Sequence, residues 1–474
     1  YKNGNVVVVA NGEIYNHKEL SAIHTKTELK GDCDIIGQMY INGISPVDIC
    51  KKLHGEFAFI IIDFERNVMF FARDHCGNRP LYISENNQII ASECVPKCEM
   101  TQVEPRQVYT ITFDHRTDLH SSRPFHFTKE KYYEFPENVD VPIHEGKIKN
   151  LFSDAVISRF TQVDDKSKIC ALLSGGLDSS SIVAIIAQHI FINAHKYKDY
   201  KFNVFTFGFE ENASDILAAK SVVKFLNSKY NNITHHIIIK KIDVGILFIY
   251  TVIRYLSSYD TTTIRASTPM MLLAREVRKM GYKAVLSGEG SDELMGGYLY
   301  FQYAPDAQEF HKECRRLLTN IHFYDGLRAD RCLASQSLEG RYPFLDQEFV
   351  NYMLTLTFKK DVDWKKNPFR RAMVGMLPDD VLWGKKEAFS DAVGFSWKDT
   401  IKKTTDEMKF DEQIESQLSQ FPDYKELTNE EKFFRHIYLK EHVYHKNVLP
   451  NGIWLPRFVN TGRDPSARAL NNYT

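Results

Sequence analysis

A glycine- and serine-rich segment in the first half of the chain could bind a phosphate. It runs from Ser174 to Ser180 with the sequence SGGLDSS, after a predicted strand at 168–173 and before a predicted helix at 181–190. Glycine lets the backbone approach an anion closely, and free N–H groups at the start of a helix point toward that anion. The segment lacks the GK[ST] ending of a Walker A loop, so transfer of a γ-phosphate is not expected. An SGG turn alone would equally fit an ordinary connection between a strand and a helix.

A second segment, rich in acidic residues, follows another short apolar strand. Its sequence is SGEGSDE, from Ser287 to Glu293, after the predicted strand at 283–286. Ligands of an open parallel sheet lie beyond the carboxyl ends of its strands, so we expect Asp178 and Asp292 to hold a magnesium ion that bridges phosphates. The alternative for Asp292 is a charge at a helix N-terminus, which the helix dipole favours by only about 0.3–1 kcal/mol. Glu289 lies between two glycines, where it gains no helical benefit, and this favours a reactive role.

These two segments need a sheet to position them, and the surrounding sequence predicts one. From Gly146 onward, apolar runs of strand type alternate with runs of helical periodicity. The predicted helices are 148–160, 181–190, 215–229 and 267–279, and the predicted strands are 168–173, 203–209, 235–239 and 283–286. This order is typical of a doubly wound parallel α/β sheet. Beyond Ala304 the pattern is mostly helical, and residues 456–474 have too little periodic apolar content for a prediction.

The first part of the chain has a different pattern, with short strands separated by turns. The predicted strands are 5–10, 57–63, 68–72, 88–91 and 108–113. A helix is predicted at 34–42, because Ile35, Ile36 and Met39 recur at helical spacing before an Asn-Gly break. Residues 114–141 lose this periodicity and are rich in His, Ser, Pro and charge, so a domain boundary is predicted there.

Composition restricts the classes of function. The chain has 60 basic and 61 acidic residues, so no overall field favours a nucleic acid as a partner. A local basic stretch, Lys196–Lys201, is interpreted as a solvated connector rather than an RNA contact. The longest apolar runs are far shorter than the roughly 20 residues that cross a bilayer, and no signal sequence is visible, so no membrane contact is expected. Eight irregularly spaced cysteines fit neither a disulfide scaffold nor a paired zinc motif, and a cytoplasmic protein with ordinary buried thiols is expected.

Several longer motifs together resemble one enzyme family. SGGLDS at the end of a strand resembles the pyrophosphate loop of ATP pyrophosphatases, which cleave ATP between its α and β phosphates. The chain also contains YDTTTIRAS from Tyr259, SGEGSDEL from Ser287, RYPFLD from Arg341 and KKEAFSDAVG from Lys385. This combination resembles glutamine-dependent asparagine synthetase over nearly the whole chain.

The resemblance implies both a fold and a reaction. An N-terminal-nucleophile-type α+β glutaminase domain, incomplete at its start, would occupy residues 1–140, and a doubly wound parallel α/β ATP-pyrophosphatase synthetase domain would occupy 141–474. The β-carboxylate of aspartate would attack the α-phosphate of ATP, with Mg²⁺ as cofactor, to give β-aspartyl-AMP and pyrophosphate. Ammonia, supplied as such or from glutamine, would then displace AMP. A homodimer is a family expectation.

The resemblance also implies roles for individual residues. Glu289 would support adenylate formation and attack by ammonia, and Lys386 would meet pyrophosphate unless it is an ordinary exposed lysine. Thr262, Thr263 and Arg265 would lie near the acyl-adenylate, where a guanidinium can pair with a carboxylate or a phosphate. The residues expected to bind ATP or pyrophosphate are Leu172, Ser174, Gly175, Gly176, Asp178, Ser179, Phe207, Ser287 and Gly288, and those expected to bind the metal are Asp178 and Asp292.

A glutamine site is predicted in the N-terminal part. Residues 11–16, NGEIYN, resemble the glutamine-binding turn of N-terminal-nucleophile glutaminases, whereas Asn-Gly alone would be an ordinary hairpin turn. Asn11 and Gly12 would donate to the oxyanion of the tetrahedral intermediate, Glu13 would contact glutamine, and Asp32 would meet the substrate amine. The family's nucleophile is an N-terminal Cys, whereas this sequence starts with Tyr, so we expect the start of the domain to be missing.

Two other interpretations remain open at this point. One is a synthetase that uses only ammonia, or a relative of β-lactam synthetase, with an inert glutaminase domain; the segment YDTTTIRASTP favours the aspartate enzyme. The other is a binding or scaffold protein that keeps the fold without turnover, and the intact acidic and lysine residues of the motifs argue against it. Two departures from the family pattern, Tyr342 in RYPFLD and Lys385 in KKEAFSD, remove no charge that catalysis needs.

Overall fold

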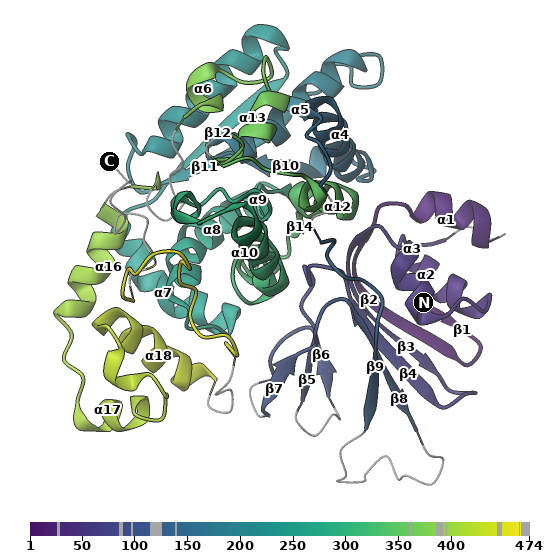
Figure 1. Ribbon diagram of the computed structural model, residues 1–474, viewed down its shortest axis with the longest axis horizontal. Coiled ribbons are helices and arrows are strands. Elements are labelled where there is room, and N and C mark those ends of the chain that lie inside the picture. The colour runs from purple at the N-terminus through teal and green to yellow at the C-terminus, as the bar shows by residue number, and fades with distance from the viewer. Residues whose placement is uncertain are drawn as a thin grey trace. The chain divides into compact units, whose positions relative to one another are not determined.

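The structure is a computed structural model that describes residues 1–25, 29–84, 89–95, 98–113, 126–137, 140–360, 362–384, 392–394, 396–442, 448–463 and 465. The chain divides into two compact units. The first contains Tyr1–Phe135 and Val443–Val448, and the second contains Pro136–His442 and Leu449–Thr474. Each unit is built on its own sheet (Figure 1).

The first unit is built on a six-stranded antiparallel sheet in the order β1-β2-β3-β4-β8-β9. Its strands are β1 Lys2–Asn3, β2 Val6–Ile14, β3 Gly55–Asp63, β4 Val68–Arg73, β8 Gln107–Thr112 and β9 Phe127–Lys131. A smaller sheet in the order β6-β5-β7 consists of β5 Tyr82–Ser84, β6 Ile90–Ala91 and β7 Met100–Gln102. The prediction of a mainly β N-terminal part is confirmed, although β5, β7 and β9 are too short or too polar to be recognised from alternation.

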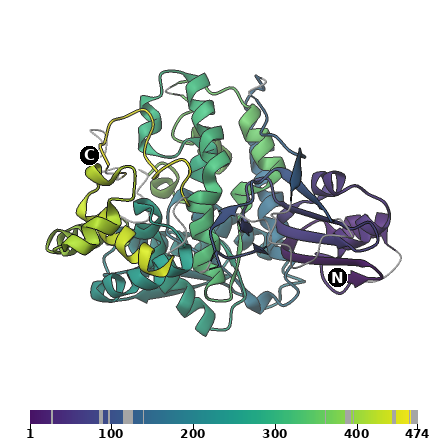
Figure 2. The same cartoon turned by 90° about the horizontal axis from the view of Figure 1, so that it is seen from below.

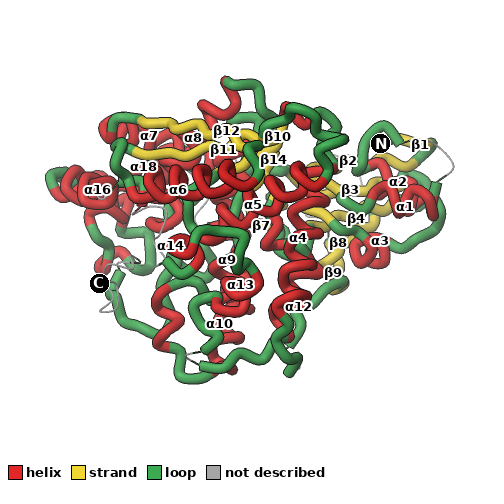
Figure 3. The backbone as a smooth tube through the Cα atoms, turned by 90° about the horizontal axis from the view of Figure 1, so that it is seen from above, coloured by secondary structure: helices red, strands yellow, loops and turns green. Residues whose placement is uncertain are grey.

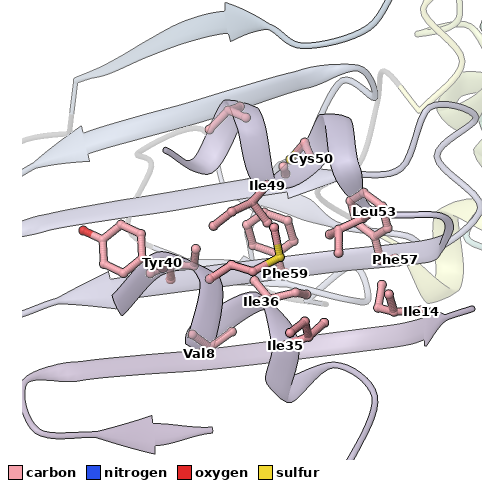
Figure 4. Packing of buried hydrophobic residues seen from close by; sticks show 14 of the residues in the cluster. Val8, Ile14, Ile35, Ile36, Tyr40, Ile49, Cys50, Leu53, Phe57 and Phe59 are labelled. Carbon is pink, nitrogen blue, oxygen red and sulfur yellow. The ribbon is translucent and has the colours of Figure 1, made fainter. Parts of the chain in front are cut away.

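The first unit also contains three short helices among its described residues: α1 His17–His24, α2 Asp34–Ile41 and α3 Pro46–Lys52. In Figure 2 the purple helices lie beside the purple strands. Ile35, Ile36 and Met39 of α2 are fully buried and pack with Phe57 and Phe59 of β3 in the core that Figure 4 shows. The predicted helix at 34–42 is therefore confirmed, and its apolar stripe is the face that meets the sheet.

The second unit contains a five-stranded parallel sheet in the order β12-β11-β10-β13-β14. Its strands are β10 Ile169–Leu172, β11 Phe202–Gly208, β12 Ile233–Ile239, β13 Ala284–Leu286 and β14 Glu339–Arg341. The chain moves outward from β10 to β12 and then returns to the other side of β10 for β13 and β14. The connections that follow β10 and β13 therefore leave in opposite directions, which opens a crevice beyond the carboxyl ends of these two strands. The predicted doubly wound parallel sheet is confirmed.

The helices of the second unit divide between the two faces of the sheet. Helices α5 Leu177–Ile192 and α6 Ser214–Lys229 follow β10 and β11, whereas α7 Ile242–Leu256, α8 Thr261–Lys279 and α11 Asp325–Ala334 belong to the return path. Parallel crossovers are right-handed, so the reversal of direction places the second group on the opposite face. The contacts agree, because α5 meets α6, and α8 meets α7 and α11. Figure 3 shows α6 running along the strands of this sheet.

Strand β14 and helix α7 of the second unit were absent from the sequence predictions. Strand β14 has the sequence EGR and carries no strand signal; it is a strand because its backbone pairs in parallel with β13. Helix α7 does carry the signal, because Ile249, Val252, Ile253 and Leu256 are buried at helical spacing.

The described residues of the second unit form further helices. They are α4 Glu145–Thr161, α9 Ser291–Met295, α10 Ala307–Asn320, α12 Gln347–Thr355, α13 Asn367–Ala372, α14 Asp379–Leu382, α16 Ser396–Asp406, α17 Glu412–Leu418 and α18 Asn429–Glu441. Among the described residues no single helix has both the length and the apolar character to cross a bilayer. Helices α7 and α8 satisfy that test only as a pair, and they are bent by 108°.

Candidate active site

The SGGLDSS segment forms the turn between β10 and α5. Gly175 has a φ of 83°, and a Cβ there would lie 2.3 Å from the backbone nitrogen of Ala219 in α6, so a side chain does not fit. Ser179 Oγ accepts a hydrogen bond from Ser174 N at 3.1 Å and closes the turn. The N-cap of α5 is Gly176, which has no side chain to occupy the first N–H groups of the helix. The turn therefore presents backbone N–H groups at the positive end of a long helix, a geometry that suits phosphate.

The SGEGSDE segment touches this turn because β13 is the neighbour of β10. A Cβ on Gly288 would lie 3.2 Å from Asp178 Cβ and 3.2 Å from Ser179 N, which shows how closely the two segments approach. Ser291 Oγ donates a hydrogen bond to Asp178 Oδ1 at 2.7 Å. The two segments that the sequence placed at strand ends thus converge at the point where the strand order reverses.

A buried lysine joins the two predicted metal ligands. Lys366 Nζ lies 2.8 Å from each carboxylate oxygen of Asp178 and 2.5 Å from Asp292 Oδ1. It also donates to Ser291 Oγ at 2.9 Å, and its side chain is 3% exposed. The carboxylates of Asp178 and Asp292 therefore converge on one position that suits a cation.

Two cavities open on these segments. The smaller has a volume of about 170 Å³, and the larger one, of about 500 Å³, lies along the SGGLDSS turn. The predicted residues that line the smaller cavity are Leu172, Ser174, Asp178, Ser179, Phe207, Thr262, Ser287, Gly288, Glu289 and Asp292. The predicted residues that line the larger cavity are Ser174, Gly175, Gly176 and Asp178. An apolar wall that suits a base and a polar turn that suits phosphates are thus contiguous.

A cluster of charged groups lines the smaller cavity at the side of Glu289. The guanidinium of Arg328 pairs with Glu289 through two hydrogen bonds, Nη1 to Oε1 at 3.0 Å and Nη2 to Oε2 at 2.6 Å. The same Nη2 donates to Asp325 Oδ1 at 2.7 Å. The hydroxyl of Tyr298 donates to Glu293 Oε1 at 2.5 Å and lies 3.3 Å from Asp325 Oδ2. Cationic and anionic groups thus lie side by side, which complements a zwitterionic amino acid.

The surroundings shift the ionisation of this cluster. Burial, together with the charges of Asp325 and Asp292, raises the pKa of Glu293 well above its usual value. Burial also raises the pKa of Tyr298, with the same carboxylates adding to the effect. Burial opposes the charge of Arg328, but Glu289 and Asp325 outweigh it and raise the pKa of the guanidinium. The cluster therefore keeps a permanent cation next to Glu289.

The TTTIR segment forms the first turns of α8, which begins earlier than the predicted helix at 267–279. Asp260 caps this helix by accepting from Thr263 N at 2.8 Å and from Thr263 Oγ1 at 2.7 Å. Arg265 pairs with Glu430 of α18, Nε to Oε1 at 2.8 Å and Nη2 to Oε2 at 2.5 Å, and both side chains are buried. Thr262 lines the smaller cavity, and its buried Oγ1 has no hydrogen-bond partner among the described residues. The structure thus brings Thr262 to the cavity and holds Thr263 and Arg265 in the surrounding framework.

A proline explains how this part of α8 is held. Pro269 lies inside α8 and has no N–H to donate to the carbonyl of Arg265 four residues earlier. The indole Nε1 of Trp397, from α16, donates to that carbonyl at 2.9 Å instead. The start of α8 is therefore anchored by the fully buried Trp397.

The predicted glutamine-binding residues lie in the first unit, on and beside β2. An ordinary hairpin turn at Asn11-Gly12, the alternative for this dipeptide, is excluded, because β2 continues through these residues to Ile14 and pairs with β3 throughout. The glycine is needed for close approach, since a Cβ on Gly12 would lie 2.0 Å from the carbonyl oxygen of Glu56. Asp32 Oδ2 accepts a hydrogen bond from Ile14 N at 2.6 Å and so lies at the end of this strand.

A cysteine lies among these residues. Cys33 Sγ contacts the carbonyl oxygen of Gly12 at 3.5 Å and Asp32 Oδ2 at 3.7 Å. Burial, followed by the negative charges of Asp32 and Glu13, raises the pKa of this thiol far above its usual value. The thiolate is therefore disfavoured, and Cys33 is not suited to be a nucleophile.

Comparison with known proteins shows the family to which the chain is similar. Residues 147–308 and 302–448 match the family described as asparagine synthase, and residues 1–96 match the glutamine amidotransferase domain. The chain belongs to the asparagine synthase family. It is 35% identical to a probable glutamine-hydrolyzing asparagine synthetase of Acanthamoeba polyphaga mimivirus, over 98% of this chain and 86% of the relative. It is 36% identical to the glutamine-hydrolyzing asparagine synthetase of Brassica oleracea, over 91% of this chain and 74% of the relative. Asparagine synthetase B of Escherichia coli K12 is 33% identical, over 91% and 78% of the two chains.

Membership of the asparagine synthase family confirms the resemblance drawn from the motifs, and the structure adds residues that those motifs did not single out. Lys386 lies outside the described residues. Lys366, Asp325 and Arg328 were missed. Asp325 and Arg328 carried a weak signal, because opposite charges three residues apart share one face of a helix. Lys366 carried none, since adjacent lysines in DWKKNPF are typical of an exposed surface.

Proposed function

We propose that this protein synthesises asparagine by activating the β-carboxylate of aspartate with ATP. The observation that carries the proposal is the convergence of the SGGLDSS turn, Asp178 and Asp292 at the point where the strand order reverses, directly beside a cavity that contains Glu289 and Arg328. Phosphates and a carboxylic acid could therefore be held next to one another. Membership of the asparagine synthase family supports the same reaction.

The nucleotide would lie across the two cavities. Leu172 and Phe207 offer apolar surface for adenine. The N–H groups in the first turn of α5, which no capping side chain occupies, would bind the β and γ phosphates. A carboxylate oxygen of aspartate would attack the α-phosphorus, and the bond from that phosphorus to the bridging oxygen would break to release pyrophosphate. The dipole of α5 stabilises the charge that accumulates on pyrophosphate, an effect that matters more in the transition state than in the bound substrate.

The residues present fit a magnesium ion. Asp178 and Asp292 supply carboxylate oxygens that already converge on one cationic position, and Mg²⁺ in such sites takes one or two carboxylates with substrate phosphates and water completing the shell. When bound there, the ion would neutralise charge on the phosphates.

The second half of the reaction converts the β-aspartyl-AMP intermediate to asparagine. Nitrogen of ammonia attacks the acyl carbon, the bond from that carbon to the phosphate oxygen of AMP breaks, and the new amide nitrogen loses a proton. Glu289 is the carboxylate that we assign to support this step, and its pairing with Arg328 fixes its orientation. The aspartate ammonium would face Asp325, and Thr262 would donate to a substrate oxygen.

Glutamine is the proposed source of ammonia, and the first unit would bind it, although residue 1 of this sequence is Tyr and not the Cys that would attack the amide. Asn11 and Gly12 would contribute oxyanion donors, and Glu13 and Asp32 would bind the polar groups of glutamine. The placement of Asp32 at the end of β2 supports this arrangement. Direct use of ammonia by the second unit is the alternative source.

The test is aspartate-dependent release of pyrophosphate from Mg-ATP by the full chain with ammonium chloride supplied. We expect one asparagine and one AMP for each pyrophosphate. Absence of pyrophosphate, or release that is equal without aspartate, would contradict the proposed adenylation. Replacing ammonium with glutamine then tests the nitrogen source separately.

A further inference from the structure

Lys366 lies on a turn with an unusual backbone conformation. Lys365 and Lys366 have φ values of 60° and 61°, in the left-handed region that residues other than glycine seldom adopt. Arg370 holds the turn, because its Nε donates to the carbonyl of Lys365 at 2.8 Å and its Nη1 donates to the carbonyl of Leu382. Backbone strain of this kind persists when surrounding contacts enforce it, and it occurs most often at functional sites.

The backbone at Gly297 packs closely against the ammonium group of Lys366. A Cβ on Gly297 would lie 2.0 Å from Asp292 Oδ1, 2.1 Å from Lys366 Cε and 2.8 Å from Lys366 Nζ. Glycine is thus required at position 297 for the lysine to reach both carboxylates. Two features therefore hold the ammonium between Asp178 and Asp292. One is the turn at Lys365–Lys366, and the other is the close backbone of Gly297.

The ammonium uses its whole donor capacity on this site. Lys366 Nζ has three N–H groups, and Asp178, Asp292 and Ser291 all accept from it or pair with it within 2.9 Å. A divalent cation bound to both carboxylates would need the same oxygens. Two cations that share these oxygens would repel each other strongly in a partly buried site. The lysine and a metal ion are therefore alternatives at this position.

We propose that Lys366 is a positioning residue that prevents Asp178 and Asp292 from binding a free divalent cation and yields the carboxylates only when nucleotide phosphates arrive with the metal. The phosphate oxygens then accept the hydrogen bonds of the displaced ammonium, so that its charge stays compensated. This inference rests on the proposed binding of Mg-ATP at the same turn. Lys366 would thus make metal binding depend on the nucleotide, and it would hold the two carboxylates in position until the nucleotide binds.

The test is a titration of the nucleotide-free full chain with Mn²⁺, in which the electron paramagnetic resonance signal reports free Mn²⁺. Wild-type protein should bind Mn²⁺ weakly, and Lys366→Met should bind it at least tenfold more tightly, because two carboxylates lose their internal counter-ion. The double variant Lys366→Met/Asp178→Asn should lose this gain. If Lys366 had a purely structural role, its replacement would leave the Mn²⁺ affinity unchanged or would lower it.

Lys365→Met is the matched control, since it removes the same charge from the neighbouring exposed residue of the same turn. It should leave the Mn²⁺ affinity of nucleotide-free protein within twofold of wild type. Circular dichroism checks folding, and Lys366→Gln replaces Lys366→Met if the latter does not fold. Equal or weaker Mn²⁺ binding by the folded Lys366 variant would overturn the proposal. The titration contains neither ATP nor aspartate. Its result can therefore be read whether or not the adenylation assay succeeds, and the two proposals can fail separately.

Discussion

The two units of this protein assemble their candidate sites in different ways. In the second unit, Asp178, Asp292 and Lys366 come from three distant segments and meet within hydrogen-bonding distance. In the first unit, Asn11, Gly12 and Glu13 are consecutive residues of one antiparallel strand, and the burial of β2 alternates from Val8 to Gly12. A parallel sheet collects loops at one edge, whereas an antiparallel strand directs successive side chains to opposite faces.

This difference determines how each site responds to mutation. A change in the second unit acts on one shared cluster of charges, so its effect should be chemical and specific. A change in β2 acts on strand pairing first, because the backbone of Gly12 contacts Glu56 directly. Substitutions in the two units therefore separate catalytic effects from effects on stability.

The largest expected effect is that of Glu289→Ala in the second unit. We expect ammonia-dependent asparagine formation to fall by about 10³-fold or more, because electrostatic and proton-transfer groups act mainly in the transition state. ATP binding, measured by calorimetry, should change by less than about threefold. Glu348→Ala, at an exposed position of α12, is the matched control and should leave turnover near wild type. Retention of normal turnover by the Glu289 variant would remove it from the catalytic site.

The next effect separates two arginines that are both paired with glutamate. Arg328→Lys should lower kcat/KM for aspartate about 10²-fold, since losing a bidentate contact to Glu289 in the cavity costs roughly 2–3 kcal/mol. Arg265→Lys should instead lower the free energy of unfolding by about 1–2 kcal/mol, through the buried pair with Glu430. Kinetics and urea unfolding of both variants provide the comparison. If Arg265→Lys lost catalysis without losing stability, Arg265 would belong to the substrate site rather than to the framework.

A smaller effect is expected for Gly12→Ala in the first unit. The added Cβ meets the backbone of β3, so the free energy of unfolding should fall by about 1–3 kcal/mol. Gly4→Ala is the control, because Gly4 also has a positive φ but a Cβ there would meet no atom within 4 Å, and it should cost about 1 kcal/mol or less. Urea unfolding measures both. A larger loss for Gly4→Ala than for Gly12→Ala would show that conformation, rather than close approach, determines the cost.

The smallest expected effect is the acid response of the second unit. Burial, with a contribution from Arg315, lowers the pKa of His311 to about 4. Between about pH 6.5 and pH 4 the unfolded chain binds the proton and the folded chain does not, so stability falls as pH falls through this window. The loss from His311 at pH 5 should be about 1–2 kcal/mol. Thermal unfolding of His311→Leu should depend less steeply on pH than that of wild type, and an unchanged slope would contradict the assignment.

Local sequence patterns predicted most of the framework. Alternating and helical periodicity identified β3, β4, β8, α2 and the strands and helices from α4 to β13 other than α7, with end errors that are largest at the start of α8, predicted at 267 and observed at Thr261. These elements depend on residues that lie close together in sequence. The strand predicted at 5–10 ended too early, because an Asn-Gly dipeptide can form a hairpin turn or a close contact within a sheet, and only the opposing strand distinguishes the two.

The sequence by itself determined that glycine-containing turns follow two buried strands and that acidic residues accompany them, because these features require only a few neighbouring residues. The tertiary structure determined which charged groups form ion pairs and which segments pair as strands. It placed Lys366 between Asp178 and Asp292, paired Arg328 rather than Arg265 with a glutamate of the cavity, and made a strand of EGR. The physical reason is that ion pairs and sheet pairing depend on which distant segments the reversal of strand order brings together, and no local pattern encodes that distance.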